Sequence, residues 1–189
     1  MKKLLPIFAL SLTTTCSFAQ KIHTNVTDEG GNRTIITSIE QARDFKDRTL
    51  FAYGVSVEAT PKDTIYHLLL SITDLSPLHI KNNARLLIKT FEGSILELRN
   101  TTDADGSVRD IHHIGTQVFS DYTATAIYDC SYEQLETLAR EGVAKIRVEE
   151  LLGIKEKEYK KDKVGKLLRT DLGLISEALA NQSDFDSDF

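Results

Sequence analysis

The segment from Asp103 to Gly115, DADGSVRDIHHIG, contains three aspartates and two adjacent histidines. Carboxylates and imidazoles are common zinc and iron ligands, and they also act as general acids and bases. The segment also contains Asp105-Gly106, a dipeptide typical of tight turns between strands. The first question is therefore whether these side chains converge on one point or are spread along a β-hairpin.

The alternation of side chains along a strand determines how the two histidines can act. Successive side chains of a strand point to opposite faces, so His112 and His113 cannot chelate one ion together. Asp110 and His112 would share a face and form the only compact ligand pair. The remaining three histidines of the chain show no HxxxH or HExxH spacing. We therefore expect no metal and no cofactor, with both histidines on an exposed strand.

The acidic start of the segment, Asp103-Ala104-Asp105-Gly106, also resembles the beginning of a calcium-binding loop. An EF-hand needs further acidic ligands and a helix on each side of the loop. Strand-like sequence surrounds this stretch instead. We interpret Asp105-Gly106 as the turn of a hairpin.

The rest of the chain carries no local motif of catalysis. GxSxG, P-loop, GxGxxG and CxxC patterns are all absent from the sequence. Cys130 lies in a strand-like run, ATAIYDCS, where a lone cysteine is usually a small buried hydrophobic residue. We therefore predict no catalytic residue, and the sequence leaves the ligand-binding residues unassigned.

The N-terminal residues have the three parts of a secretory signal. A basic start (KK) precedes an apolar run from Leu4 to Leu12, and the small-residue sequence SFA ends at Ala19. The apolar run is too short to span a bilayer. We predict cleavage after Ala19 and a periplasmic or secreted mature protein. Lipoprotein anchoring at Cys16 is the alternative, although Thr13 stands where a leucine-like residue is preferred.

The charge of the chain limits the classes of partner. The formal net charge is −5 at pH 7, and general nucleic-acid binding needs a basic face, so it is not expected. The basic segment from Lys155 to Arg169 could contact anionic lipid, but we prefer a solvated helix face with ion pairs such as Glu156 with Lys160. We expect an unknown protein or glycan partner at the cell envelope.

Short runs rich in Val, Ile, Thr and Tyr alternate with turn residues between Thr34 and Cys130. Their period-two alternation, as from Thr64 to Thr73, indicates antiparallel strands. We expect hairpin turns at Glu92-Gly93 and Asp105-Gly106, which would make residues 84–118 a three-stranded meander. The predicted fold is mainly β (α+β): an antiparallel β-sandwich or strongly curved sheet with one short helix and a C-terminal helix packed on it.

The short helix is predicted from its boundaries. Ser131 and Gln134 have capping-box spacing, and Gly142 is a typical helix stop. Leu135, Leu138 and Ala139 would share one face of this helix.

The C-terminal helix is predicted from Glu156 to Ala180. A helical projection from Val164 gathers its apolar residues into one stripe, namely Leu167, Leu168, Leu172, Leu174, Ile175, Ala178 and Leu179. Asp171 falls in the middle of that stripe, where an unpaired carboxylate would be costly. Either Asp171 pairs with a base, or the helix breaks and Asp171 caps a second helix. We favour the break.

These assignments give one globular domain, residues 34–180, after a signal peptide (1–19) and a flexible lead-in (20–33) and before a disordered acidic tail (181–189). The blocks YDCSYEQLETLAREGVAKIRVEE and YKKDKVGKLL resemble small secreted proteins of unknown function from Gram-negative gut bacteria, over about residues 84–170. The resemblance lies in packing residues, so it implies location and fold type and no activity.

The expected function is an exported, non-enzymatic binding or interaction module of the bacterial cell envelope. The alternative is a small periplasmic hydrolase or carbohydrate-active accessory domain. An enzyme predicts titratable groups that converge in a cleft with shifted pKa values. A binding module predicts an exposed aromatic or apolar patch, such as one built from Tyr and Phe on strand faces.

Overall fold

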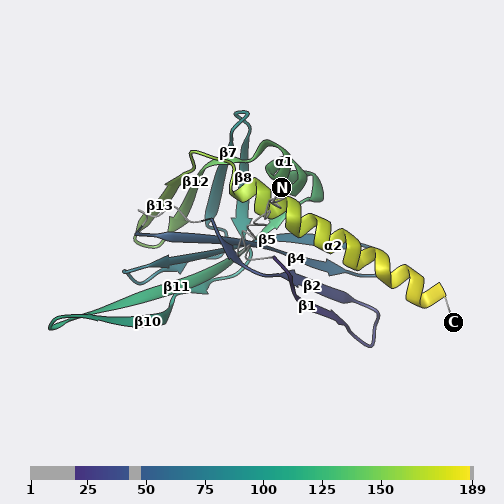
Figure 1. Ribbon diagram of the computed structural model, residues 1–189, viewed down its shortest axis with the longest axis horizontal. Helices are drawn as coiled ribbons and strands as arrows, with labels where there is room; N and C mark the ends of the chain where they lie inside the picture. Colours follow the sequence, from purple (N-terminus) through teal and green to yellow (C-terminus); the bar gives the residue numbers. More distant parts are fainter. Residues whose placement is uncertain (1–19, 43–47, 188–189) are drawn as a thin grey trace, which may run out of the picture.

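A computed structural model describes residues 20–42 and 48–187 of the chain. The predicted signal peptide and the lipidation alternative at Cys16 lie outside the described residues. The described chain is mainly antiparallel β-structure with two helices on a large open sheet (Figure 1), which confirms the predicted class. No helix in this part of the chain is long and apolar enough to cross a membrane.

The elements follow one another along the chain in this order: β1 (Ile22–Thr27), β2 (Arg33–Thr37), β3 (Glu40–Gln41), β4 (Leu50–Ala59), β5 (Thr64–Asp74), β6 (His79–Ile80), β7 (Arg85–Thr90), β8 (Ile95–Asn100), β9 (Ala104–Asp105), β10 (Ser107–Ile114), β11 (Gln117–Cys130), α1 (Tyr132–Glu141), β12 (Val143–Glu150), β13 (Gly153–Glu158) and α2 (Val164–Ser187).

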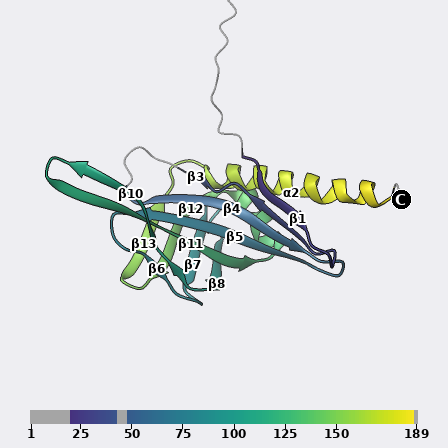
Figure 2. The same ribbon diagram turned by 90° about the horizontal axis from the view of Figure 1, so that it is seen from below.

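The main sheet bends sharply in its middle. Its strand order is β1-β2-β4-β5-β11-β8-β7-β12-β13, with β3 attached to β4 and β10 attached to β11. β11 pairs with β5 from Tyr122 to Cys130 but meets β8 only at Tyr128 and Asp129. Because so few residues join the two halves, β7, β8 and β12 can run steeply across β4 and β5 (Figures 1 and 2). The sheet is therefore strongly curved and is not a closed sandwich.

Asn100 holds the backbone together at this bend. The residue is 1% exposed. Its side-chain nitrogen donates to the carbonyl oxygens of Ile80, Lys81 and Thr102, and its side-chain oxygen accepts a hydrogen bond from the Ile127 amide. The Asn100 side chain therefore supplies hydrogen bonds to main-chain groups that the short pairing of β8 with β11 leaves without a partner.

The core fills the inside of the bend. Tyr53 of β4 and Tyr159, which follows β13, are both buried, and their hydroxyl oxygens are 2.7 Å apart. Tyr53 lies in one half of the sheet and Tyr159 follows the last strand of the other. The bond therefore connects the two halves through the core.

The short helix α1 begins and ends as predicted. The Ser131 hydroxyl accepts a hydrogen bond from the Gln134 amide, and the Gln134 side chain accepts one from the Ser131 amide, which completes the capping box. Gly142 follows the helix with φ of 69°. Leu135, Leu138 and Ala139 are buried as predicted.

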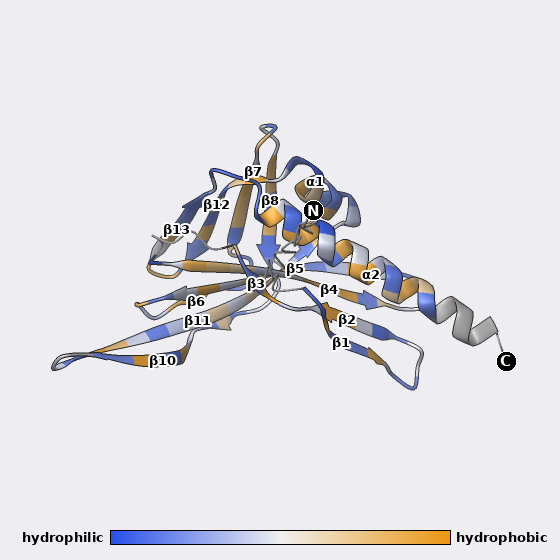
Figure 3. Ribbon diagram, in the orientation of Figure 1, coloured by the Kyte–Doolittle hydropathy of each residue, from blue (hydrophilic) through white to orange (hydrophobic). Residues whose placement is uncertain are grey.

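The long helix α2 lies on the β2–β4 part of the sheet and against α1 (Figure 1). Figure 3 shows apolar residues recurring along α2 between polar ones. Val164, Leu168, Ile175 and Ala178 are buried, and Leu167, Leu172 and Leu179 pack partly buried against the core. This confirms the predicted stripe except at Leu174, which is partly exposed and does not belong to the core cluster. A side chain at Gly165 would collide with the backbone of Gly142 and Leu138, so this glycine allows α1 and α2 to touch.

The prediction of a break near Asp171 is wrong, because α2 is continuous from Val164 to Ser187. Asp171 is fully buried within it, and burial raises the pKa of its carboxyl to about 7. A carboxyl that holds its proton does not need the pairing or the exposure that a charged one demands. The apolar stripe can therefore run through this position.

The predicted start of this helix at Glu156 is also wrong. Residues 153–158 form β13, and the charges that suggested helical ion pairs lie across two strands instead. Arg147 of β12 pairs with Glu156 at 2.5 Å, and Lys145 pairs with both Glu156 and Glu158. Alternating charges suit a solvated strand face as well as a helix face. The basic segment is therefore divided between β13 and the first turns of α2.

Both ends of the described chain are more regular than expected. Residues 22–27, which were expected in the flexible lead-in, form β1 and pair with β2. The Asp28 side chain accepts hydrogen bonds from the amides of Gly30 and Asn32 and so orders the turn between the two strands. Residues 181–187, expected in a disordered tail, continue α2. An existing helix extends at little cost, because each added residue gains a hydrogen bond.

The predicted three-stranded meander is correct only for its first hairpin. β7 and β8 pair around Glu92-Gly93, but β8 does not pair with β10. Asp105 belongs to β9, which pairs with β6, and Gly106 donates its amide hydrogen to the Leu78 carbonyl at 2.7 Å. A Cβ on Gly106 would lie 2.9 Å from that oxygen, so the glycine serves a close backbone approach and not a hairpin turn. The hairpin turn lies at Gly115, with φ of 62°, between β10 and β11.

Candidate functional site

The histidines of the DADGSVRDIHHIG segment lie on a two-stranded arm formed by β10 and the start of β11, which projects from the body (Figures 1 and 2). His112 is paired across the strands with Phe119, and His113 with Val118, so they face opposite sides. His112 Nε2 lies 3.0 Å from Asp121 Oδ2 and 3.8 Å from Asp110 Oδ2. The hydrogen bond to Asp121 and the charge of Asp110 raise the pKa of His112.

The pairing of Asp110 with His112 thus occurs as predicted, with Asp121 as a further partner. Asp121 could not be found from local spacing, because it reaches His112 through the hairpin register. Among the described residues, no three His, Cys, Asp or Glu side chains are grouped so as to hold a metal ion.

We expect purified protein to contain essentially no bound zinc or iron, and the His112→Ala plus His113→Ala variant to be the same. The physical reason is that the two imidazoles point to opposite faces of the arm. Elemental analysis by mass spectrometry measures this directly. Stoichiometric zinc in the parent that disappears from the double variant would contradict the expectation.

Asp103 and Asp105, the acids at the start of the DADGSVRDIHHIG segment, form contacts in and beside the small β6–β9 sheet. Asp103 accepts a hydrogen bond from the Asn82 amide at 2.7 Å, and Asp105 contacts the His79 ring. Both carboxylates therefore have partners within the fold, and neither is arranged as part of a calcium loop.

Cys130 is held as a neutral thiol. It is partly buried, its Sγ donates to the Tyr66 carbonyl at 3.6 Å, and burial raises the pKa of the thiol to about 12. Only the thiolate is a good nucleophile. Cys130 therefore serves packing, in agreement with its interpretation as a small hydrophobic residue.

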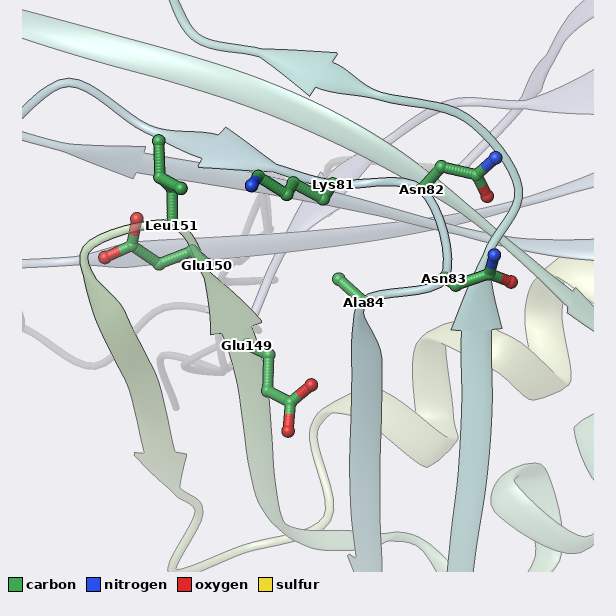
Figure 4. Close-up of a pocket in the computed structure, with 7 residues that line it drawn as sticks. All are labelled: Lys81, Asn82, Asn83, Ala84, Glu149, Glu150 and Leu151. Atoms are coloured by element: carbon green, nitrogen blue, oxygen red, sulfur yellow. The ribbon is translucent and has the colours of Figure 1, made fainter.

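A polar pocket of about 270 Å³ lies between the β6–β7 turn and the end of β12 (Figure 4). Its lining consists of Lys81, Asn82, Asn83, Ala84, Glu149, Glu150 and Leu151. Asn83 has φ of 62°, and it is the only residue other than glycine with positive φ among those described. Such a conformation is costly for most residues but common for Asn. It gives this turn a defined shape.

Both carboxylates of the polar pocket are already engaged. Glu149 forms an ion pair with Arg85, which lowers the pKa of the Glu149 carboxyl. Glu150 accepts a hydrogen bond from the Leu152 amide at 3.0 Å. In Figure 4 the Glu149 side chain points down along the strand, away from Lys81 and Glu150. These acids do not converge on a common point, as a general acid and base would.

A second, wider pocket of about 550 Å³ lies where β5 begins, β11 ends and α1 begins. We call it the tyrosine pocket. Its lining consists of Thr64, Ile65, Tyr66, Asp129, Cys130, Ser131, Tyr132 and Gln134. The rings of Tyr66 and Tyr132 are 5.4 Å apart between centroids and tilted by 58°. Ile65 is 45% exposed and Tyr132 47% exposed.

Sheet register and helix capping together position this pair of rings. Tyr66 of β5 lies opposite Cys130 of β11 in the register. Two residues later the chain enters α1, and the capping box at Ser131 fixes Tyr132 as the first residue of the helix. Partial burial and the neighbouring Tyr132 raise the pKa of the Tyr66 phenol. Tyr66 therefore stays neutral and can both donate and accept hydrogen bonds.

Polar groups surround the two rings. Asp129 pairs with His67 at 2.9 Å. In the capping box, the Ser131 hydroxyl oxygen and the Gln134 side-chain oxygen act as acceptors. The Ser131 hydroxyl hydrogen and the Gln134 side-chain nitrogen remain as further donors. Flat apolar faces next to a few hydrogen-bonding groups are the usual composition of a ligand site.

No family model, curated protein or solved structure matches the chain. The resemblance to small secreted proteins of gut bacteria therefore remains a prediction.

Proposed function

We propose that the protein is an exported, non-enzymatic binding module of the bacterial cell envelope, and that its ligand binds in the tyrosine pocket. The observation that carries this proposal is the Tyr66–Tyr132 pair, with Tyr132 47% exposed beside the exposed Ile65. Burial of large aromatic and aliphatic side chains is favourable, and exposed side chains of this kind do not gain that free energy. A ligand on the pocket would recover part of it.

The chemistry of the pocket favours an uncharged, hydroxyl-rich ligand such as a neutral glycan. Tyrosine faces provide flat apolar contact, while Gln134, Ser131 and Asp129 offer donors and acceptors around it. The negative net charge of the chain opposes the approach of acidic polymers. A protein partner anchored on Tyr132 and Ile65 is the alternative that the experiment below also detects.

The alternative function is that of an enzyme, a small periplasmic hydrolase. It would need a free acid and a free base in one cleft. The polar pocket is the place where such groups could be sought, but Glu149 is bound to Arg85 and Glu150 to a backbone amide. The geometry therefore supports binding at the tyrosine pocket better than hydrolysis at the polar pocket.

Export with cleavage after Ala19 is part of the proposal. Its support is the basic start, the apolar run and the small residues of the N-terminal sequence. We expect N-terminal sequencing of the protein from an envelope fraction to begin at Gln20. Protein confined to the cytoplasm with Met1 intact would contradict export, and a lipid on Cys16 would show the lipoprotein route.

A pull-down from envelope extract with the mature chain tests the binding proposal without assuming a ligand. We expect the Tyr66→Ala plus Tyr132→Ala variant to retain roughly a tenth or less of the bound material, because the ligand loses both ring faces. Phe91→Ala is the matched control, since Phe91 is 45% exposed on the β7–β8 turn and does not line the tyrosine pocket. Equal loss in both variants, or no loss in either, would contradict a site at the tyrosine pocket.

A further inference from the structure

The projecting arm leaves one edge of β10 open. Among the described strands, β10 pairs with β11 alone. β11 pairs with β5 only from Tyr122 onward, so residues 117–121 are joined to β10 and to no other described strand (Figure 2). A ribbon of two strands is marginally stable in water, whereas three or more strands with an apolar face are stable. The arm is therefore an incomplete sheet whose next strand would lie beside β10.

The hairpin turn determines which main-chain groups of β10 face the open edge. Ile114 and Gln117 flank a loop of two residues, and residues in these positions form a hydrogen-bonded pair. Hydrogen-bonded and non-hydrogen-bonded pairs alternate along an antiparallel ladder. Ile111 and Ser120, three pairs further from the turn, are therefore a non-hydrogen-bonded pair. The N–H and C=O groups of Ile111 point away from β11, toward the open edge.

The Ile111 amide has a side-chain acceptor where a neighbouring strand would provide a carbonyl. It donates to Asp110 Oδ1 at 2.8 Å, within the same strand, in agreement with its direction toward the open edge. The Asp110 side chain is exposed. An unpaired edge of this kind is a template for another strand. A carbonyl from an incoming strand could replace the Asp110 carboxylate, which would then be free to contact a side chain of that strand.

The core side of the arm carries exposed apolar side chains. Ala124 and Ala126 of β11 are buried in the core, and side chains alternate along a strand, so Val118 points to the same side. Ile111 lies there as well, because its partner in the register is Ser120. Ile111 is 54% exposed and Val118 is 60% exposed. Nothing in the described part of the chain buries these two side chains.

We propose that β10 pairs antiparallel with β10 of a second copy of this chain, about a two-fold axis at Ile111. In this register the two Ile111 residues lie opposite each other and exchange the main-chain hydrogen bonds that the open edge offers. The two arms then form one sheet in the order β11-β10-β10-β11. The apolar side chains of both arms lie on the same side of this sheet, and two-fold dimers are the commonest homo-oligomers.

The charges on β10 favour a second copy over an unrelated strand. With Ile111 on the axis, Asp110 of each copy lies opposite His112 of the other. The two positions form non-hydrogen-bonded pairs, in which side chains are closest. The hydrogen bond to Asp121 and the charge of Asp110 raise the pKa of His112, which favours the imidazolium. Opposite charges in directly opposed positions stabilise a sheet. Because the pair occurs twice about the axis, the strand is complementary to itself.

Disulfide formation between two cysteine variants of the mature chain tests the register. Positions 110 and 112 of opposite copies should have Cα atoms about 4.5 Å apart, within the range of about 4.4–6.8 Å that a disulfide requires. We expect a disulfide-linked dimer when Asp110→Cys is mixed with His112→Cys under mild oxidation. Each variant alone should form little, because identical positions lie on the diagonal, about 7–8 Å apart. The parent is the control, since burial raises the pKa of the Cys130 thiol to about 12.

Analytical ultracentrifugation tests the association itself. The parent should sediment as a dimer, and Ile111→Lys should weaken the dimer about tenfold or more, because two ammonium groups meet at the axis. Val26→Lys is the matched control, since Val26 is 58% exposed on β1, at the far end of the strand order. This variant should remain a dimer. A parent that is monomeric at every concentration, or a dimer that Ile111→Lys leaves intact, would overturn the proposal.

The remaining outcomes separate this proposal from its alternatives. Equal disulfide yields in the mixture and in the separate variants would contradict the register about Ile111. A His112→Cys chain that is cross-linked to a different protein of the envelope extract, and not to the Asp110→Cys chain, would assign the open edge to that protein and overturn the pairing of two copies. Binding at the tyrosine pocket is tested independently, because no residue of β10 lines that pocket.

Discussion

Leu168→Asp is expected to lower the melting temperature by roughly 10 °C or more. Leu168 is fully buried on the inner face of α2. The substitution forfeits roughly 1.5–3 kcal/mol of apolar burial and places a carboxylate, at a cost of several kcal/mol, against the core. A domain of this size loses about 2–4 °C per kcal/mol. Differential scanning calorimetry measures the shift.

Ser176→Asp is the matched control, because Ser176 lies on the exposed side of the same helix. Surface substitutions usually change stability by about 0.5 kcal/mol or less, so this variant should melt near the parent temperature. Removal of the chain after Lys163 should in addition expose apolar surface that binds a hydrophobic dye. A truncated chain that melts like the parent and binds no dye would show that α2 is not part of the core.

Asp171→Asn is expected to remove a pH dependence of stability from the protein. Burial raises the pKa of Asp171 from 3.8 to about 7 in the folded state. The folded state then holds a proton that the unfolded state has lost, so stability falls as the pH rises from about 4 to about 7. A shift of this size corresponds to roughly 4 kcal/mol.

Chemical denaturation at about pH 5 and pH 8 measures this effect. The parent chain should lose about 2–3 kcal/mol more than Asp171→Asn between the two values, and the variant should be the more stable protein at the higher pH. Glu40 is the charged neighbour that acts in the same direction. The Glu40→Gln variant should therefore show a smaller pH dependence than the parent. Parallel pH profiles for the parent and Asp171→Asn would contradict a buried, protonated carboxyl.

Features determined by a few consecutive residues could be predicted from the sequence. The capping box at Ser131, the stop at Gly142 and the apolar stripe of α2 all depend on local spacing, and all three occur in the structure. The strands of the curved sheet also follow from period-two alternation. In contrast, the partner of each strand depends on contacts between distant segments. Asp105-Gly106 has the sequence of a hairpin turn, but its backbone meets Leu78.

The candidate site could not be predicted for the same reason. Tyr66 and Tyr132 are far apart along the chain, and only the pairing of β5 with β11 places their rings 5.4 Å apart. The strand β13 was missed because alternating Lys and Glu support both cross-strand and helical ion pairs. Asp171 lies within the continuous helix α2, and its burial, which raises the pKa of the carboxyl, depends on tertiary packing that local spacing does not contain.

Chemical-shift mapping by NMR, with a neutral glycan fraction from the cell envelope added to the mature chain, tests the central claim most directly. Binding at the tyrosine pocket predicts that the largest changes occur at Ile65, Tyr66, Ser131, Tyr132 and Gln134, and that they disappear in Tyr132→Ala. Changes centred on Lys81–Ala84 and Glu149–Leu151 would place the ligand in the polar pocket and contradict the proposal. Absence of any change at saturating glycan, together with an empty pull-down, would contradict a binding function for the tyrosine pocket.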